Sequence, residues 1–203
     1  YTAAFVYGRA MQERGFVIPG ARILKRAWQI YVAHIFLFVI YVAELAYVTA
    51  SFENPLFAEE MNALDFLKTP DVTIIQALLL KFKPANMDVL PLYIVLMGFF
   101  PPVLWMMLRK PDLVMLGSLA LYFSARQFGW NFSSYPSGSW YFNPYTWQLL
   151  FVFGAWFALG GAKESQSIIK SRWLLIAGSI YLFFALVMTM AGRFEAFGDL
   201  FPR

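Results

Sequence analysis

Five long apolar blocks, separated by connections that carry most of the charge, constrain this chain more than any other feature of its sequence. An α-helix needs roughly 17–25 residues to cross the hydrocarbon core of a bilayer, and each block is close to that length. Arg126 and the Gly160-Gly161 pair shorten the third and fourth blocks. The five blocks comprise residues 28–50, 89–108, 113–130, 144–161 and 173–191.

The composition excludes a soluble domain. Charged residues make up 14% of the 203 residues and hydrophobic residues 60%, whereas about 25% of an average soluble domain is charged. We therefore predict an all-α, polytopic integral membrane helix bundle with five full spans, preceded by the end of an earlier span at residues 1–7. The chain begins without Met or a signal peptide. We interpret residues 1–203 as a single transmembrane domain, incomplete at both ends.

The distribution of Lys and Arg predicts the orientation, because cytoplasmic loops carry an excess of these residues. The first, third and fifth connections hold ten of the 16 basic residues and three of the 12 acidic residues. The alternate connections and the C-terminal end hold the other six basic residues and eight acidic ones, which leaves Glu44 inside a span. Residues 9–26, 109–112 and 162–172 are therefore predicted to be cytoplasmic, and residues 51–88 and 129–144 to lie outside.

The first outer connection is too long for a simple turn, and we predict an extracytoplasmic helical insertion at about 51–88. It contains two short helical patterns, at 56–68 and 71–82, which follow Pro55 and Pro70. Apolar residues at helical spacing in the second pattern predict a face that lies on the membrane or on the bundle. They are Ile74, Leu78, Leu79 and Phe82.

Arg22, Lys25 and Arg26 form the densest basic group, at the predicted cytoplasmic end of the 28–50 span. Arg22 and Arg26 are four residues apart, so on a helix they share a face and can contact one phosphate group together. The alternative is a purely anchoring role, in which these side chains extend to lipid phosphates.

His34 is the only histidine and lies inside the same span, with Tyr41 and Glu44 further along it. The offsets of seven and three residues can place all three on one broad stripe of the helix. Ionisable residues within a membrane usually face a cavity or a partner. His34 is thus a candidate general base, or a neutral imidazole that is hydrogen-bonded across the bundle.

Two outer regions hold candidate substrate-binding residues. Asn86 and Asp88 precede the 89–108 span, where they could bind a sugar, although Asp88 could equally be a helix cap. The 129–144 loop and the residues after it mix aromatic rings with amides, which a sugar site needs for stacking and for hydroxyl contacts. Aromatic residues also gather at any membrane interface, which is the alternative. The candidates in the second region are Trp130, Asn143, Trp147 and Gln148.

Several classes of site are not indicated. The chain contains no cysteine, so it offers no disulfide framework and no thiolate metal ligand. It contains no P-loop and no dinucleotide-binding glycine motif. We predict no metal site, no permanently bound cofactor and no nucleic-acid partner. The lipid bilayer is the expected partner, and no oligomeric state is predicted.

Four stretches resemble OpgC-type membrane proteins. The two longer ones are Asn86-Met-Asp-Val-Leu-Pro-Leu-Tyr-Ile-Val-Leu96 and Phe142-Asn-Pro-Tyr-Thr-Trp-Gln-Leu-Leu-Phe-Val-Phe-Gly-Ala-Trp156. The shorter ones are Arg26-Ala-Trp-Gln-Ile-Tyr-Val-Ala-His34 and the stretch at Gly8-Arg9. OpgC-type proteins are succinyltransferases for osmoregulated periplasmic glucans and are related to a broader family of membrane acyltransferases. The resemblance covers most of the chain.

This resemblance implies an O-acyltransferase in the bacterial inner membrane. The donor would be a cytoplasmic acyl-CoA, succinyl-CoA in particular, whose phosphates Arg22, Lys25 and Arg26 would contact, and the acceptor a periplasmic glucan or other carbohydrate. Related acyltransferases carry an essential histidine in their first helix, which would lie upstream of Tyr1, so His34 is a supporting catalytic candidate. The alternative function is a transporter or flippase for a small anionic or carbohydrate substrate.

Overall fold

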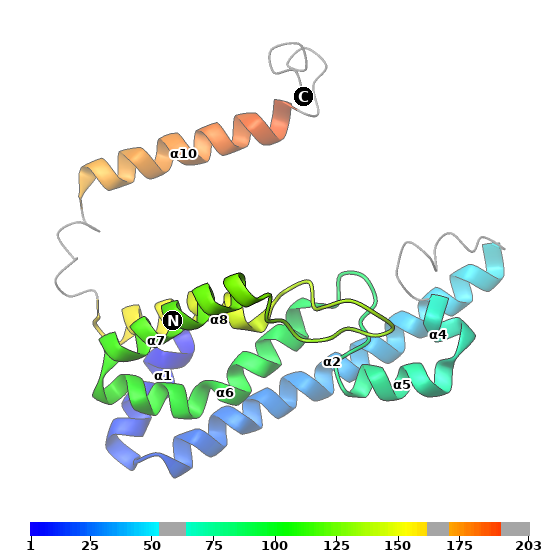
Figure 1. The fold of residues 1–203 in the computed structure, drawn as a ribbon, viewed down its shortest axis with the longest axis horizontal. Coiled ribbons are helices and arrows are strands. Elements are labelled where there is room, and N and C mark those ends of the chain that lie inside the picture. The colour runs from blue at the N-terminus through cyan, green and yellow to red at the C-terminus, as the bar shows by residue number, and fades with distance from the viewer. Residues whose placement is uncertain (53–63, 162–170, 192–203) are drawn as a thin grey trace. The chain divides into compact units, whose positions relative to one another are not determined.

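The computed structural model describes residues 1–52, 64–161 and 171–191, and the regular elements in these ranges are α-helices (Figure 1). Residues 1–161 form one compact unit, and the last helix belongs to a second unit that is considered by itself. The all-α fold class is therefore confirmed for the described residues. The helices are α1 (Thr2–Arg14), α2 (Val17–Phe52), α4 (Leu64–Lys68), α5 (Pro70–Leu78), α6 (Val89–Arg109), α7 (Pro111–Phe128), α8 (Pro144–Ala158) and α10 (Arg172–Ala191).

The first two helices are longer than the apolar blocks indicated. α1 continues to Arg14 and ends at Gly15, whose φ of 75° lies in the region that favours glycine. α2 begins at Val17, so Arg22, Lys25 and Arg26 lie on this helix. Most of the predicted connection at residues 9–26 is therefore helical, and its cytoplasmic location stays a prediction. Hydropathy marks only the part of a helix that suits lipid, whereas Lys and Arg are good helix formers and continue the helix beyond it.

The main core lies where α1, α2, α6 and α8 meet, and α7 packs along α8. Leu104 and Phe100 of α6 are fully buried at its centre, beside small residues such as Ala4 and Ala155. Small residues let helices in a membrane approach closely. Gly8 is such a contact, because a Cβ atom there would lie 2.8 Å from Cδ2 of Leu159.

Three helices in the described ranges are long and apolar enough to cross a membrane: Val17–Ser51, Val89–Arg109 and Arg172–Thr189. They correspond to the first, second and fifth predicted spans. α7 has 18 residues and carries Asp112 and Arg126, and α8 has 15 residues, about 22 Å at 1.5 Å per residue, which is less than the bilayer core of about 30 Å. The count of five spans therefore stays a prediction.

The second predicted outer helix ends earlier than its apolar pattern indicated. α5 begins at Pro70 and ends at Leu78, and Leu80 then takes a φ of 59°, which is not helical. The prediction that the helix reaches residue 82 is therefore wrong. Phe82 is instead fully buried in a second cluster with Phe38 and Val42 of α2. Ile74, Leu78 and Leu79 are exposed, so within the described unit this face is uncovered. The first predicted outer helix lies partly outside the described residues, and α4 is its described part.

Candidate functional site

The loop between α7 and α8 is held in a fixed shape by its own hydrogen bonds. α7 ends at Gly129, which adopts a left-handed conformation with a φ of 68°. The Trp140 amide then donates to the Phe132 carbonyl at 2.9 Å, and the Asn131 Nδ2 donates to the Trp140 carbonyl at 2.8 Å. As predicted, the loop forms no helix. The backbone of this loop is therefore held in one conformation by hydrogen bonds within the loop.

A polar pocket of about 450 Å³, which we call the outer pocket, lies between this loop and the ends of α7 and α8. Trp147, which is 41% exposed, supplies an aromatic wall. Arg126 supplies a positive charge, and no acidic residue lines the pocket. An aromatic face with hydroxyl and amide groups suits a carbohydrate. The lining residues are Ala125, Arg126, Gly129, Asn131, Ser139, Tyr141, Asn143, Thr146 and Trp147.

Of the four sugar-binding candidates in this region, the outer pocket brings together Asn143 and Trp147. The Asn143 amide already makes two internal hydrogen bonds: its Oδ1 accepts from the Tyr145 amide at 2.9 Å, and its Nδ2 donates to the Trp130 carbonyl at 2.6 Å. Asn143 is thus the N-cap of α8 and also fixes the loop. Trp130 is 47% exposed, stacks on Phe128 and does not line the pocket.

Gln148 joins α8 to α7. Its Oε1 accepts from the Ser118 hydroxyl at 2.6 Å, and its Nε2 donates to the Ser118 carbonyl at 2.8 Å. The same nitrogen also lies 3.2 Å from the Tyr145 carbonyl. These bonds satisfy the side-chain amide within the protein. They matter because an unpaired polar group inside a membrane would cost several kcal/mol. Gln148 therefore holds α8 against α7 and is not among the residues that line the outer pocket.

Lys83 and Asp88 form a charged pair beneath the loop, between α5 and α6. The Lys83 side chain is 3% exposed, and its Nζ lies 4.0 Å from the Asp88 Oδ1 and 3.9 Å from the centre of the Trp140 ring. Nζ also donates to the Leu80 carbonyl at 3.3 Å. Asp88 occupies the N-cap position of α6, but its side chain makes no capping hydrogen bond. Its interaction with Lys83 takes the place of the predicted cap.

Burial shifts the pKa of each member of this pair in the direction that favours its neutral form. Burial lowers the pKa of Lys83 from 10.5 to about 8, and the negative charge of Asp88 opposes part of this shift. Burial likewise raises the pKa of Asp88, and Lys83 opposes that shift. Lys83 is the only Lys or Arg in the described ranges that is buried, and Asp88 and Trp140 are among the groups that face its charge.

His34 is buried in the same part of the molecule, 2% exposed. Its Nδ1 has no hydrogen-bond partner among the described residues, and the Lys83 charge acts on its ring. The three residues of the stripe predicted on α2 do not line one common hollow. Tyr41 and Glu44 line a hollow of about 350 Å³ together with Asn86, and His34 is not part of the lining of that hollow.

The basic cluster lies at the other end of α2, on its first turns. Arg22, Lys25 and Arg26 are all exposed, and Arg26 Nη1 lies 3.4 Å from the Gln29 Oε1. Ile23 and Ala27 between them are buried in the main core. Arg22 and Arg26 therefore lie on an uncovered face of the helix, available to a ligand or to lipid.

Sequence patterns did not single out Lys83, Arg126 or Ser118. Lys83 was counted as one of the basic residues of an outer connection, and Arg126 as a residue that shortens an apolar block. Both assignments rest on neighbours along the chain. The contacts of Lys83 with Asp88 and Trp140, and the position of Arg126 in the lining of the outer pocket, follow from the fold. Trp140 belonged to the aromatic group of the loop, but no local signal placed Lys83 against it.

The comparisons with known proteins agree with the resemblance in the sequence. The family model described as OpgC protein matches residues 1–203, which is the whole chain. The searches of curated proteins and of solved structures gave no match. Because the family match extends over all of the residues that form the core, the outer pocket and the buried pair, the chain belongs to the OpgC family.

Proposed function

We propose that this chain is part of a membrane O-acyltransferase, which transfers a succinyl group from cytoplasmic succinyl-CoA to a periplasmic glucan. In this reaction a sugar hydroxyl oxygen attacks the thioester carbonyl, a C–O bond forms, the C–S bond breaks, and the proton of the hydroxyl leaves with the CoA thiol. Membership of the OpgC family supports acyl transfer. The outer pocket is the observation that carries the choice of a carbohydrate acceptor.

The outer pocket offers a sugar three kinds of contact. Trp147 presents a ring on which a pyranose can stack, and Ser139 and Tyr141 present hydroxyl groups. Arg126 presents a cation that suits the free carboxylate of a succinyl group. Because the amide of Asn143 is used within the protein, we assign this residue to shaping the pocket, and Gln148 to holding α8 against α7.

On the other side of the membrane, we propose that Arg22, Lys25 and Arg26 contact the phosphates of the donor. Their exposure on the first turns of α2 supports this assignment. His34 is proposed as a positioning residue rather than as the general base, because its ring is buried and is not part of the lining of the outer pocket. Asn86 and Asp88 are kept as acceptor-side residues, Asn86 in the hollow beside Glu44 and Asp88 through its interaction with Lys83.

Replacing Trp147 tests the acceptor site. Trp147→Ala is expected to lower kcat/KM for the glucan about 5–30-fold, the equivalent of about 1–2 kcal/mol, because a partly exposed aromatic face is lost. Trp147→Phe is expected to have a smaller effect, since it keeps an aromatic ring. The measurement is succinyl transfer at varied glucan concentration in membranes with matched protein levels.

Trp28→Ala is the matched control, because Trp28 lies on α2, is 63% exposed and is not among the residues that line the outer pocket. An equal loss in Trp28→Ala and Trp147→Ala would show that the tryptophans only hold helix ends at the interface. If the wild-type protein instead moves its substrate without forming an ester, the transporter alternative holds.

The proposed two-sided arrangement predicts opposite accessibility of two serines. Single cysteines at Ser137 and Ser167 of the full protein, otherwise free of cysteine, should be labelled by a membrane-impermeant maleimide from opposite sides. Ser137 lies in the outer loop, and Ser167 lies in the predicted cytoplasmic connection, outside the described residues. Labelling of intact spheroplasts and of inverted vesicles measures this difference. Labelling of both positions in the same preparation would contradict the orientation and the separation of donor and acceptor.

A further inference from the structure

A long apolar crevice lies between α6, α7 and α8, apart from the outer pocket. It consists of two adjoining hollows of about 430 and 290 Å³ that share four lining residues, and we call the two together the crevice. The shared residues are Val103, Leu121, Gln148 and Val152. One end reaches Arg109 and Lys110 at the turn between α6 and α7, and the other reaches Pro144 and Tyr145 at the start of α8.

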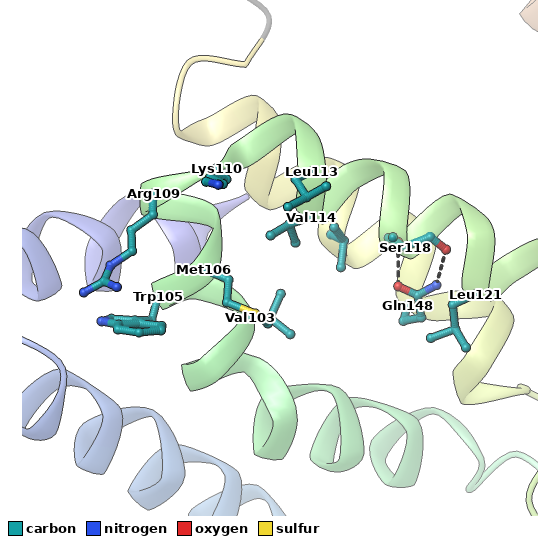
Figure 2. A pocket seen from close by; sticks show the side chains of 12 residues that line it. Val103, Trp105, Met106, Arg109, Lys110, Leu113, Val114, Ser118, Leu121 and Gln148 are labelled. Carbon is teal, nitrogen blue, oxygen red and sulfur yellow. Dashed lines mark hydrogen bonds between the residues drawn. The ribbon is translucent and has the colours of Figure 1, made fainter.

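The lining of the crevice suits a hydrocarbon chain rather than a polar ligand. Ser118 and Gln148 are polar residues in its wall, and their side chains are hydrogen-bonded to each other. Figure 2 shows this pair at one side of the first hollow, with Trp105 and Arg109 at the opposite side. The polar amides of a pantetheine arm would find few partners here, whereas a methylene chain needs none.

The basic end of the crevice suits an anionic headgroup. The Arg109 guanidinium lies 3.7 Å from the centre of the Trp105 ring, and Lys110 is exposed beside it. Neither residue forms an ion pair within the described ranges. The nearby acid, Asp112, accepts a hydrogen bond from the Trp156 Nε1 at 3.0 Å. Arg109 and Lys110 therefore give this end of the crevice a net positive charge.

We propose that the crevice is a binding site for an anionic phospholipid, with one acyl chain along α6–α8 and the headgroup phosphate at Arg109 and Lys110. Charge complementarity favours this occupant over a zwitterionic lipid. It also favours it over another helix, which would leave Arg109 and Lys110 without an anionic partner. By the predicted orientation, the site faces the inner leaflet, where anionic headgroups attract basic residues. This site does not depend on the proposed acyl transfer.

The test compares phospholipids bound to the full-length protein. Purified protein is incubated in detergent with phosphatidylglycerol or with phosphatidylcholine, and bound lipid is measured by native mass spectrometry. Wild-type protein should retain phosphatidylglycerol in preference. Arg109→Gln/Lys110→Gln should reduce that preference about tenfold or more, because two cations near the headgroup are lost.

A second variant fills the crevice itself. Gly117 lines the first hollow, and a Cβ atom there would meet nothing within 4 Å, so Gly117→Phe places a ring in the space of the acyl chain. It should abolish retention of phosphatidylglycerol. Gly98→Phe is the matched control, since Gly98 is also a helical glycine with open space around its Cβ but lies outside the crevice. Arg9→Gln/Arg14→Gln is the matched control for charge, because both side chains are exposed on α1 and line neither hollow.

Both controls should retain phosphatidylglycerol as the wild type does. Equal retention of the two lipids by wild-type protein would overturn the proposal, as would equal losses in the test and control variants. Absence of any bound lipid from the wild type would also overturn it, because the crevice would then be covered by protein. Melting temperatures of each variant identify any that fail to fold, and the charge variants then decide the result.

Discussion

Asp88→Asn is expected to destabilise the folded protein by about 2–3 kcal/mol. Removing one member of a buried ion pair typically costs about 3–5 kcal/mol, because the remaining charge is left without compensation. The expected value here is lower, since the Asp88 side chain is 23% exposed and lies 4.0 Å from Lys83. The physical cause is the Lys83 ammonium, which would lose its negatively charged neighbour Asp88 while it keeps its contacts with the Trp140 ring and the Leu80 carbonyl.

The measurement is thermal unfolding of the purified protein in detergent at neutral pH. Glu13→Gln is the matched control, because Glu13 pairs with Arg9 on the exposed surface of α1, where such a pair contributes about 0–1 kcal/mol. The double variant Lys83→Met/Asp88→Leu should recover most of the lost stability, since apolar replacement of a buried pair is often neutral. A double variant less stable than Asp88→Asn would contradict this account.

The pH dependence of stability should reveal the buried Lys83 directly. Its pKa is about 8 in the folded protein and about 10.5 in an exposed lysine. Between these values the unfolded chain binds more protons than the folded protein, so the free energy of unfolding must rise with pH. Below about pH 8 the cost of burying the charge is fully present, and it is relieved as the pH approaches 10.5. The expected gain is on the order of 1–3 kcal/mol.

The variant Lys83→Met isolates this effect, because it keeps the aliphatic stem and lacks the titrating amine. The difference in free energy of unfolding between wild type and Lys83→Met should shift in favour of the wild type from pH 8 to pH 10.5. Lys110→Met is the control for removal of a lysine at an exposed position. A flat difference for Lys83→Met would mean that Lys83 is solvated in the folded protein.

These predictions bear on the proposed acceptor site because the pair contacts the loop that shapes the outer pocket. Trp140, whose ring lies over the Lys83 ammonium, is held through its carbonyl by Asn131. Asn131 and the neighbours of Trp140, Ser139 and Tyr141, line the outer pocket. Loss of Asp88 should therefore raise the KM for the glucan as well as lower stability, since binding sites need rigid support.

The sequence by itself determined the fold class, the position of most helices and the family. Long apolar blocks predict helices because a helix satisfies its backbone hydrogen bonds within one segment, so the signal is local. The motifs at 86–96 and 142–156 carried the resemblance that the family match over residues 1–203 confirmed. The loop after Gly129 was predicted to lack a helical period, and it forms none.

Tertiary structure alone decided which polar side chains are used within the protein and which face a pocket. Gln148 and Ser118 are 30 residues apart, and their hydrogen bonds form only because α7 and α8 pack together. Likewise, Lys83 meets Trp140 in the folded protein, where the neighbouring Phe82 is buried against α2. Hydropathy and helical spacing describe neighbours along the chain, whereas a buried charge or amide is satisfied by whichever distant group the packing brings to it.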